Sequence, residues 1–149
     1  RALRERRGDE MSQAPDFSAF DEPKLEALIE TMYHAATADG EFSEPERAEF
    51  VQNVATLTDK RLDDKTVDAL VKVIAARTGA EGREARLRAA KESLGTERLR
   101  MIALELTIRI VAADGIVRTS ERELLLELAE AFEIDRDKAA DLVKATTNL

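Results

Sequence analysis

Two short acidic segments hold the residues of this chain whose types and spacing best suit a chemical role. Asp39 is followed seven residues later by Glu46, and Asp114 is followed at the same distance by Glu121. Carboxylate oxygens are the ligands that hard divalent cations such as Ca²⁺ prefer, and Ca²⁺ takes about six to eight oxygens. One segment alone supplies too few, whereas the two together supply four carboxylates. These four residues are therefore the candidate metal ligands.

The composition excludes most other kinds of site. The 149 residues include no cysteine, which rules out disulfides, thiolate metal sites and a thiol nucleophile. His34 is the only histidine, so a catalytic triad or a histidine-ligated metal would depend on it alone. We rank a hydrolase built on His34 last, because the sequence offers it no second catalytic partner. A non-enzymatic protein is expected.

The two acidic segments belong to an internal repeat. A shift of 75 residues lays residues 38–47 over residues 113–122 without a gap, with Ala, Asp, Gly, Glu and Arg in common. The second half of each segment matches the end of an EF-hand loop. The first acidic EF-hand ligands are replaced by Ala35, Thr37, Ile110 and Ala112. A normal EF-hand is therefore excluded, and a duplicated helix-loop-helix with pseudo-two-fold symmetry is predicted.

Apolar residues recur every three or four positions, which predicts an all-α fold of about seven helices and no strand. The expected helices cover residues 23–40, 44–56, 63–79, 82–94 and 97–113, with one more after Gly115 and one opened by Asp135. The helix over 97–113 has almost no polar face and should run through the middle of the core.

The chain divides into a predicted flexible N-terminal tail over residues 1–22 and one helical domain over residues 23–149. A domain of this length buries its own core without a disulfide or a metal. Its apolar runs fall short of the about 20 residues that a membrane-spanning helix needs. The first residues are rich in arginine and lack the apolar stretch of a secretory signal, so a cytoplasmic location is expected. The net charge of −8 disfavours nucleic acid as a partner.

The candidate aspartates also have a structural interpretation. Asp39 and Asp114 fit helix-end turns in which the following glycine adopts a positive φ. Arg47 and Arg122, each directly after a candidate glutamate, are alternatives to a metal, because either can pair with a loop carboxylate as a latch.

The two candidate glutamates differ in their local sequence. Glu46 stands third in a capping box opened by Ser43, so it has a structural role available. Glu121 aligns opposite Arg118, which cannot cap a helix, and the box in this copy is expected to move to Ser120. Because Glu121 is present although the capping box is expected elsewhere, a role in the loop is favoured for it.

Other charged residues are assigned structural roles. Glu105 lies four residues before Arg109 on a predicted helix, a spacing typical of an ion pair. Glu30 and Glu105 fall on a different helix face from the loop aspartates. His34 is expected to make an ordinary polar contact. The arginines from Arg83 to Arg100 alternate with glutamates and are predicted to solvate a helix surface, with the docking of an acidic partner as the alternative.

The repeated Ala-Asp-Gly and Glu-Arg pattern, each copy joining two helices, resembles the TerB-like domain of tellurite-resistance proteins. Residues 132–135, which open the last helix, fit the same pattern, and a similar domain lies at the N-terminus of the co-chaperone DjlA. The resemblance covers about residues 24–148. It implies an all-α, pseudo-symmetric domain of about seven helices.

The resemblance also implies a function. It implies that Asp39, Glu46, Asp114 and Glu121 bind a divalent metal, with Ca²⁺ favoured and Mg²⁺ or Mn²⁺ as alternatives. The expected partners are proteins, in a stress-response complex at the inner face of the membrane. Arg118 departs from related second loops, which often carry further acidic residues. The alternative is a metal-free protein-protein adaptor or co-chaperone-type domain.

Overall fold

A computed structural model describes residues 20–40, 42–114 and 116–147, and within these residues the chain forms seven α-helices and no strand. The all-α prediction is confirmed. In chain order the elements are α2 (Glu22–Ala36), α3 (Glu44–Leu57), α4 (Asp64–Glu81), α5 (Arg83–Leu94), α6 (Glu97–Val111), the short 3₁₀ helix η2 (Ala112–Asp114), α7 (Thr119–Ala131) and α8 (Arg136–Thr147).

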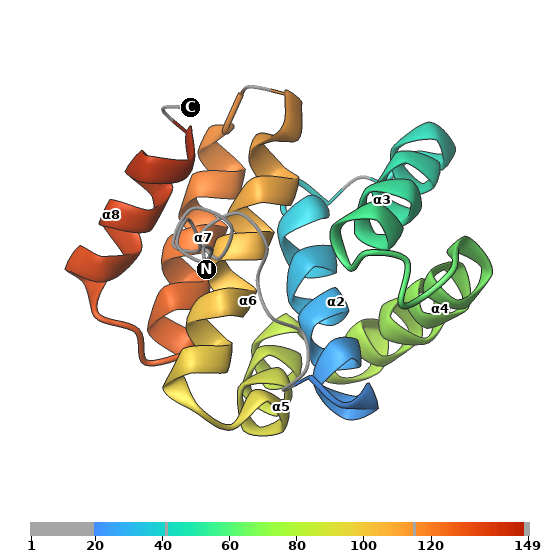
Figure 1. The fold of residues 1–149 in the computed structure, drawn as a ribbon, viewed down its shortest axis with the longest axis horizontal. Coiled ribbons are helices and arrows are strands. Elements are labelled where there is room, and N and C mark those ends of the chain that lie inside the picture. The colour runs from blue at the N-terminus through green and yellow to red at the C-terminus, as the bar shows by residue number, and fades with distance from the viewer. Residues whose placement is uncertain (1–19, 41, 115, 148–149) are drawn as a thin grey trace, which may run out of the picture.

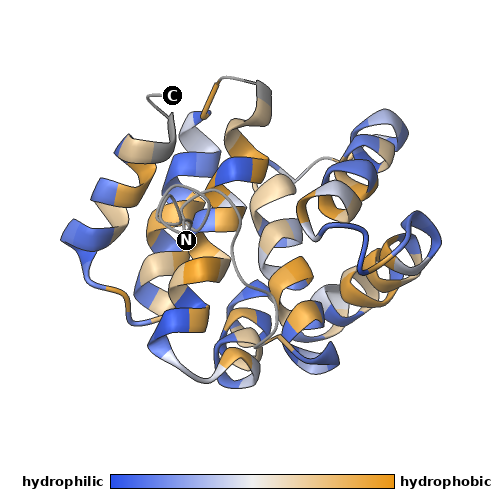
Figure 2. Ribbon diagram, viewed as in Figure 1, coloured by the Kyte–Doolittle hydropathy of each residue, from blue (hydrophilic) through white to orange (hydrophobic). Residues whose placement is uncertain are grey.

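Two helices, α2 and α6, form the centre of the domain (Figure 1). α2 packs against α4, α5, α6 and α7, and α6 packs against α8 as well. Figure 2 shows hydrophobic residues along all the helices, alternating with hydrophilic ones. The prediction that the helix after residue 97 runs through the core is confirmed, and α2 is buried to the same extent, with Leu28, Ile29 and Met32 fully covered.

Side-chain caps fix where most helices begin. Asp21, Ser43, Asp63 and Thr96 each accept a hydrogen bond from the backbone amide three residues later. Each such bond satisfies one of the amides that a helix start leaves without an intrahelical partner. The local sequence therefore sets the starts of α2, α3, α4 and α6.

Three helix ends differ from the prediction by two residues or more. α2 ends at Ala36 rather than at Gly40, with Thr37 as its C-cap residue. α4 passes through Gly79 and ends at Glu81, because Gly82, with φ of 90°, supplies the left-handed turn. α6 ends at Val111, and its last predicted residues form η2 instead.

The first helix begins at Glu22, one residue before the position predicted for it. Phe20 is buried at 1% exposure within the core cluster, and Asp21 caps α2. Residues 1–19 of the predicted tail lie outside the described residues. Among the helices that the structure describes, none is both long and apolar enough to cross a bilayer.

Candidate metal and interaction site

The predicted site residues lie at the two helix junctions, α2–α3 and α6–α7. At the end of α2, the Thr37 hydroxyl donates to the Tyr33 carbonyl at 2.9 Å, and Gly40 turns the chain with φ of 85°. At the end of α6 the chain continues as η2, whose last residue is Asp114. Each copy of the repeat thus places an aspartate after one helix and a glutamate in the first turn of the next.

One groove of about 210 Å³ runs between the two junctions. Three of the four predicted ligands, Asp39, Glu46 and Glu121, line it. Glu49 and Asn53, from the next turns of α3, add two more oxygen-bearing side chains that the sequence pattern did not single out. Their signal was available, since both lie on the helix face that Glu46 begins. The duplicated fold therefore brings carboxylates from both copies to one surface.

The fourth predicted ligand, Asp114, is placed by its backbone at the end of η2, and its side chain lies outside the described part of the structure. Ala113, directly before it, lines the groove. The backbone therefore places Asp114 directly after a residue that lines the groove.

Aromatic packing supports the first junction. The rings of Tyr33, Phe42 and Phe50 meet edge to face, with centroids 5.7 to 6.5 Å apart. Such pairs add about 0.5–1.5 kcal/mol each beyond the area they bury. Phe42 and Phe50 also line the groove, so the acidic side chains of α3 share its lining with packed aromatic rings.

Both candidate glutamates cap a helix. The Ser43 amide donates to Glu46 Oε1 at 2.8 Å, and the Arg118 amide donates to Glu121 Oε1 at the same distance. In the first copy the Ser43 hydroxyl completes the capping box. In the second copy a guanidinium has no acceptor, so only the glutamate half forms.

The predicted move of the second cap to Ser120 is therefore wrong. α7 begins at Thr119, which makes Arg118 the N-cap residue and puts Glu121 at the third helical position. Glu121 has the same structural role as Glu46. Its presence is explained by the helix start as well as by the loop.

The arginines near the two junctions contact different parts of the molecule. Arg47 reaches Asp68 of α4, with Nε 3.0 Å and Nη2 2.9 Å from Oδ1, so the predicted latch to a loop aspartate does not form in this copy. Arg118 Nη1 lies 3.6 Å from Glu121 Oε1 at the edge of the groove. Arg122 lies instead beside the surface between α7 and α8.

The donor chemistry of the groove matches a hard cation, because its polar lining is rich in carboxylate oxygen and contains no sulfur or imidazole. Within residues 20–40, 42–114 and 116–147, no three Asp, Glu, His or Cys side chains stand close enough together to hold a metal ion. A metal would therefore require the groove carboxylates to draw together.

A buried ion pair between α2 and α5 was not predicted. Glu30 is 4% exposed and accepts two hydrogen bonds from Arg86, from Nε at 2.7 Å and from Nη2 at 2.9 Å. Arg86 also donates to Glu81 at 3.1 Å. The prediction that the arginines of residues 83–100 only solvate a surface is wrong for Arg86. The pair joins residues 56 positions apart, which no local pattern reveals.

Charge neighbours decide the ionisation of this cluster. Burial alone would raise the pKa of Glu30, but hydrogen bonds from His34 and Arg86, with the charge of Arg86, outweigh it and lower the pKa to about 2. The hydrogen bonds with Glu30 raise the pKa of Arg86. His34 is 1% exposed and its Nε2 lies 3.4 Å from Glu30 Oε2. This is the expected polar contact, and it leaves His34 without the surface access that a hydrolase base needs.

The corresponding pair in the second copy is confirmed. Arg109 Nη2 lies 2.9 Å from Glu105 Oε2, and each side chain is 30% exposed. This ion pair is therefore solvated where the Glu30 pair is enclosed.

Comparison with known proteins agrees with this arrangement. The family model described as tellurite resistance protein TerB matches residues 26–145, a span that includes both junctions and the groove between them. No curated protein and no solved structure matches the chain. The family match confirms the resemblance carried by the repeated acidic segments, and the chain belongs to the TerB family of tellurite resistance proteins.

Proposed function

We propose that this chain is a non-enzymatic stress-response module of the tellurite-resistance type, which binds a divalent cation through its two acidic loops and mediates protein-protein interaction. The ligands are Asp39, Glu46, Asp114 and Glu121. The observation that supports this is the single groove on which carboxylates from both copies of the repeat meet.

Electrostatics favours a cation in this groove. Carboxylates gathered on one surface repel one another, and a divalent ion removes that repulsion. The capping bonds of Glu46 and Glu121 are made by one oxygen each, and a carboxylate has about four acceptor positions on its two oxygens. Capping and metal binding are therefore compatible. Oxygen donors favour Ca²⁺, with Mg²⁺ or Mn²⁺ as alternatives.

Thermal unfolding of chelator-treated protein tests the proposal, with Ca²⁺, Mg²⁺, Mn²⁺ or Zn²⁺ added in turn. An ion that binds only the folded state stabilises it by about 2.7 kcal/mol at a hundred times its dissociation constant. We expect Asp114→Asn and Glu121→Gln to lose this gain. Glu123→Gln is the matched control, because Glu123 is an exposed carboxylate on the same helix that does not line the groove. Equal stabilisation of all three variants would contradict the assignment.

A second candidate is a metal-free protein-protein adaptor or co-chaperone-type domain. Its supporting observation is that Glu46 and Glu121 already hold the starts of α3 and α7 without any ion. This candidate predicts that none of the four ions shifts the unfolding temperature.

The cellular setting proposed here is cytoplasmic, in a protein complex at the inner face of the membrane. Its role in tellurite resistance is indirect, because the chain has no thiol with which to reduce or ligate the oxyanion. Fractionation of cells expressing the chain, with and without tellurite, tests this. Protein found only in the soluble fraction under both conditions would contradict the membrane-associated complex.

A further inference from the structure

A second groove lies between α7 and α8 and shares no residue with the groove between the loops. It has a volume of about 310 Å³. Its floor is formed by the buried side chains of Leu104, Leu125 and Ala139, and its walls by Leu126 and Val143. α7 and α8 lie side by side, as Figure 1 shows. The groove is therefore an apolar channel between two helices.

Leu126 gives this groove an apolar edge in contact with solvent. Its exposure is 41%, although it follows directly on the buried Leu125. Single exposed leucines are ordinary on protein surfaces. Here the exposed leucine borders a hollow, and the small side chain of Ala140 on the facing helix leaves the α8 backbone open to close approach. The surface thus has room for inserted side chains.

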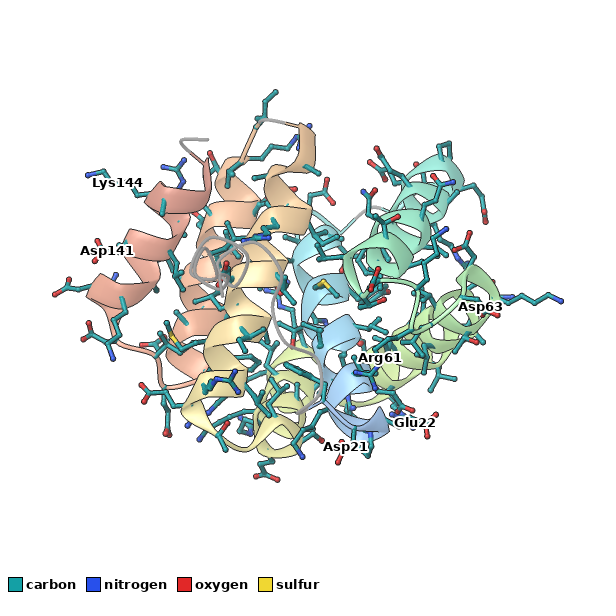
Figure 3. The ribbon with its side chains drawn as sticks, viewed as in Figure 1. Asp21, Glu22, Arg61, Asp63, Asp141 and Lys144 are labelled. Atoms are coloured by element: carbon teal, nitrogen blue, oxygen red, sulfur yellow. The ribbon has the colours of Figure 1, made fainter. Side chains whose placement is uncertain are left out.

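The charges at this groove have one sign. Two charged residues line it in the described structure, Arg122 and Lys144, and both are cations although the chain carries a net charge of −8. Arg122 is in the first turn of α7, and Lys144, labelled in Figure 3, is in the last turn of α8. The start of α7 and the end of α8 lie at the same end of the helix pair (Figure 1). Asp141, one turn before Lys144, lies outside the groove lining.

The groove between α2 and α4 is a natural comparison. It too is apolar, with Leu25, Leu70 and the 43% exposed Val73, but its charged lining consists of the carboxylates Glu22 and Glu26. The same fold therefore presents two apolar grooves with opposite charge at their edges. A partner with acidic flanks is favoured by one of them and repelled by the other.

We propose that the α7–α8 groove binds an acidic amphipathic helix of a protein partner. The apolar side chains of the partner helix enter the channel beside Leu126 and Val143. Helices that dock in grooves do so through residues at i, i+3, i+4 and i+7. The carboxylates of the partner helix pair with Arg122 and Lys144 at the end of the channel, where a guanidinium can donate two parallel hydrogen bonds to one carboxylate.

Titration of the full ¹⁵N-labelled chain with two synthetic helical peptides tests the proposal. Both carry leucines at i, i+3, i+4 and i+7, one with glutamates and the other with lysines on the flanks. We expect the glutamate peptide to move the amide signals of residues 122–126 and 139–144, and to bind at least ten-fold more tightly than the lysine peptide. Equal binding of the two peptides, or signals moving at Val73 instead, would overturn the proposal.

Variants distinguish specific binding in the groove from nonspecific hydrophobic binding of the peptide. Leu126→Ser should weaken the glutamate peptide at least five-fold, whereas Val73→Ser, a matched change at an equally exposed residue, should leave binding unchanged. Arg122→Glu with Lys144→Gln should abolish the preference for the glutamate peptide. Circular dichroism checks that each variant keeps its helices.

Two other occupants are tested with the same variants. Self-association in sedimentation experiments that Leu126→Ser abolishes would assign the groove to a second copy of the chain. The chain could bind phosphatidylglycerol vesicles more tightly than the peptide and lose this binding in Arg122→Glu with Lys144→Gln. That result would assign the groove to a lipid surface. Either result would overturn the proposal of a helical protein partner.

Discussion

The two helix junctions carry the same aspartate and glutamate but hold them in different surroundings. The first junction has a complete capping box from Ser43 and Glu46 and an aromatic wall. The second has aliphatic residues instead, and the N-cap residue of its helix is Arg118, which contributes its amide but no side-chain acceptor. In both, the glutamate holds the N-cap amide. The shared glutamate is therefore explained by helix initiation, while the difference in charge at the groove comes from Arg118.

A second pair of positions shows what burial adds. His34 lies near Glu30 in the first copy as Arg109 lies near Glu105 in the second, each four residues apart on a central helix. Only the first pair is enclosed, because α5 covers it and supplies Arg86. The same spacing thus produces an enclosed polar contact in one copy and a solvated ion pair in the other.

The largest expected effect comes from breaking the buried pair. Arg86→Ala leaves Glu30 buried without its main cationic partner, which costs about 3–5 kcal/mol of unfolding free energy. The matched change Arg109→Ala, in the pair whose side chains are each 30% exposed, should cost at most about 1 kcal/mol. Urea unfolding at pH 7 measures both. Similar costs for the two variants would show that burial does not distinguish the copies.

Acid should weaken the domain through the same residue. The pKa of Glu30 is about 2 in the folded chain against an ordinary 4.5, so its contribution is present above pH 4.5 and is lost as the pH falls toward 2. Across that window the unfolded chain binds the extra proton, which gives a slope of at most about 1.4 kcal/mol per pH unit.

Glu30→Gln tests this pH dependence. It should be less stable than the parent at pH 7 and should show a shallower loss of unfolding free energy between pH 4.5 and 2. Glu105→Gln, the same change in the more exposed pair, serves as the comparison. A parental slope in Glu30→Gln would mean that other carboxylates dominate acid unfolding.

Local patterns in the sequence predicted the fold well and the polar contacts poorly. Helical spacing, the cap at Ser43 and the Glu105–Arg109 pair all depend on residues within one or two turns, and all are confirmed. The bond from Arg86 to Glu30 spans 56 residues and depends on how α5 packs on α2, which one sequence does not reveal. The N-cap of α7 was predicted at Ser120, because serine is a preferred N-cap residue. In the structure Arg118 is the N-cap residue, and its amide donates a hydrogen bond to Glu121.

Removing the N-cap side chains should change the unfolding free energy differently at the two junctions, by less than the loss of Arg86. Ser43→Ala removes the hydroxyl that accepts the Glu46 amide, which costs about 1 kcal/mol. Arg118→Ala removes no acceptor, and the Arg118 side chain that pairs with Glu121 is 53% exposed, so the unfolding free energy should change by less than about 0.5 kcal/mol. Chemical denaturation of the two variants beside the parent measures the difference. A larger loss in Arg118→Ala would assign Arg118 a structural role that its contact with Glu121 does not explain.

The smallest expected effect is also the most informative about the groove. Arg118→Ser gives α7 the hydroxyl acceptor that α3 already has, so the second capping box becomes complete and stability rises by about 0.5 kcal/mol. The same change removes a positive charge that lies 3.6 Å from Glu121. If the groove takes up Ca²⁺, the ion then no longer competes with the guanidinium, and half-saturation in a thermal titration moves to a lower Ca²⁺ concentration. Stabilisation without ion and a change in Ca²⁺ response are separate measurements, so a completed cap with an unchanged Ca²⁺ response would confirm the helix start and contradict the cation site.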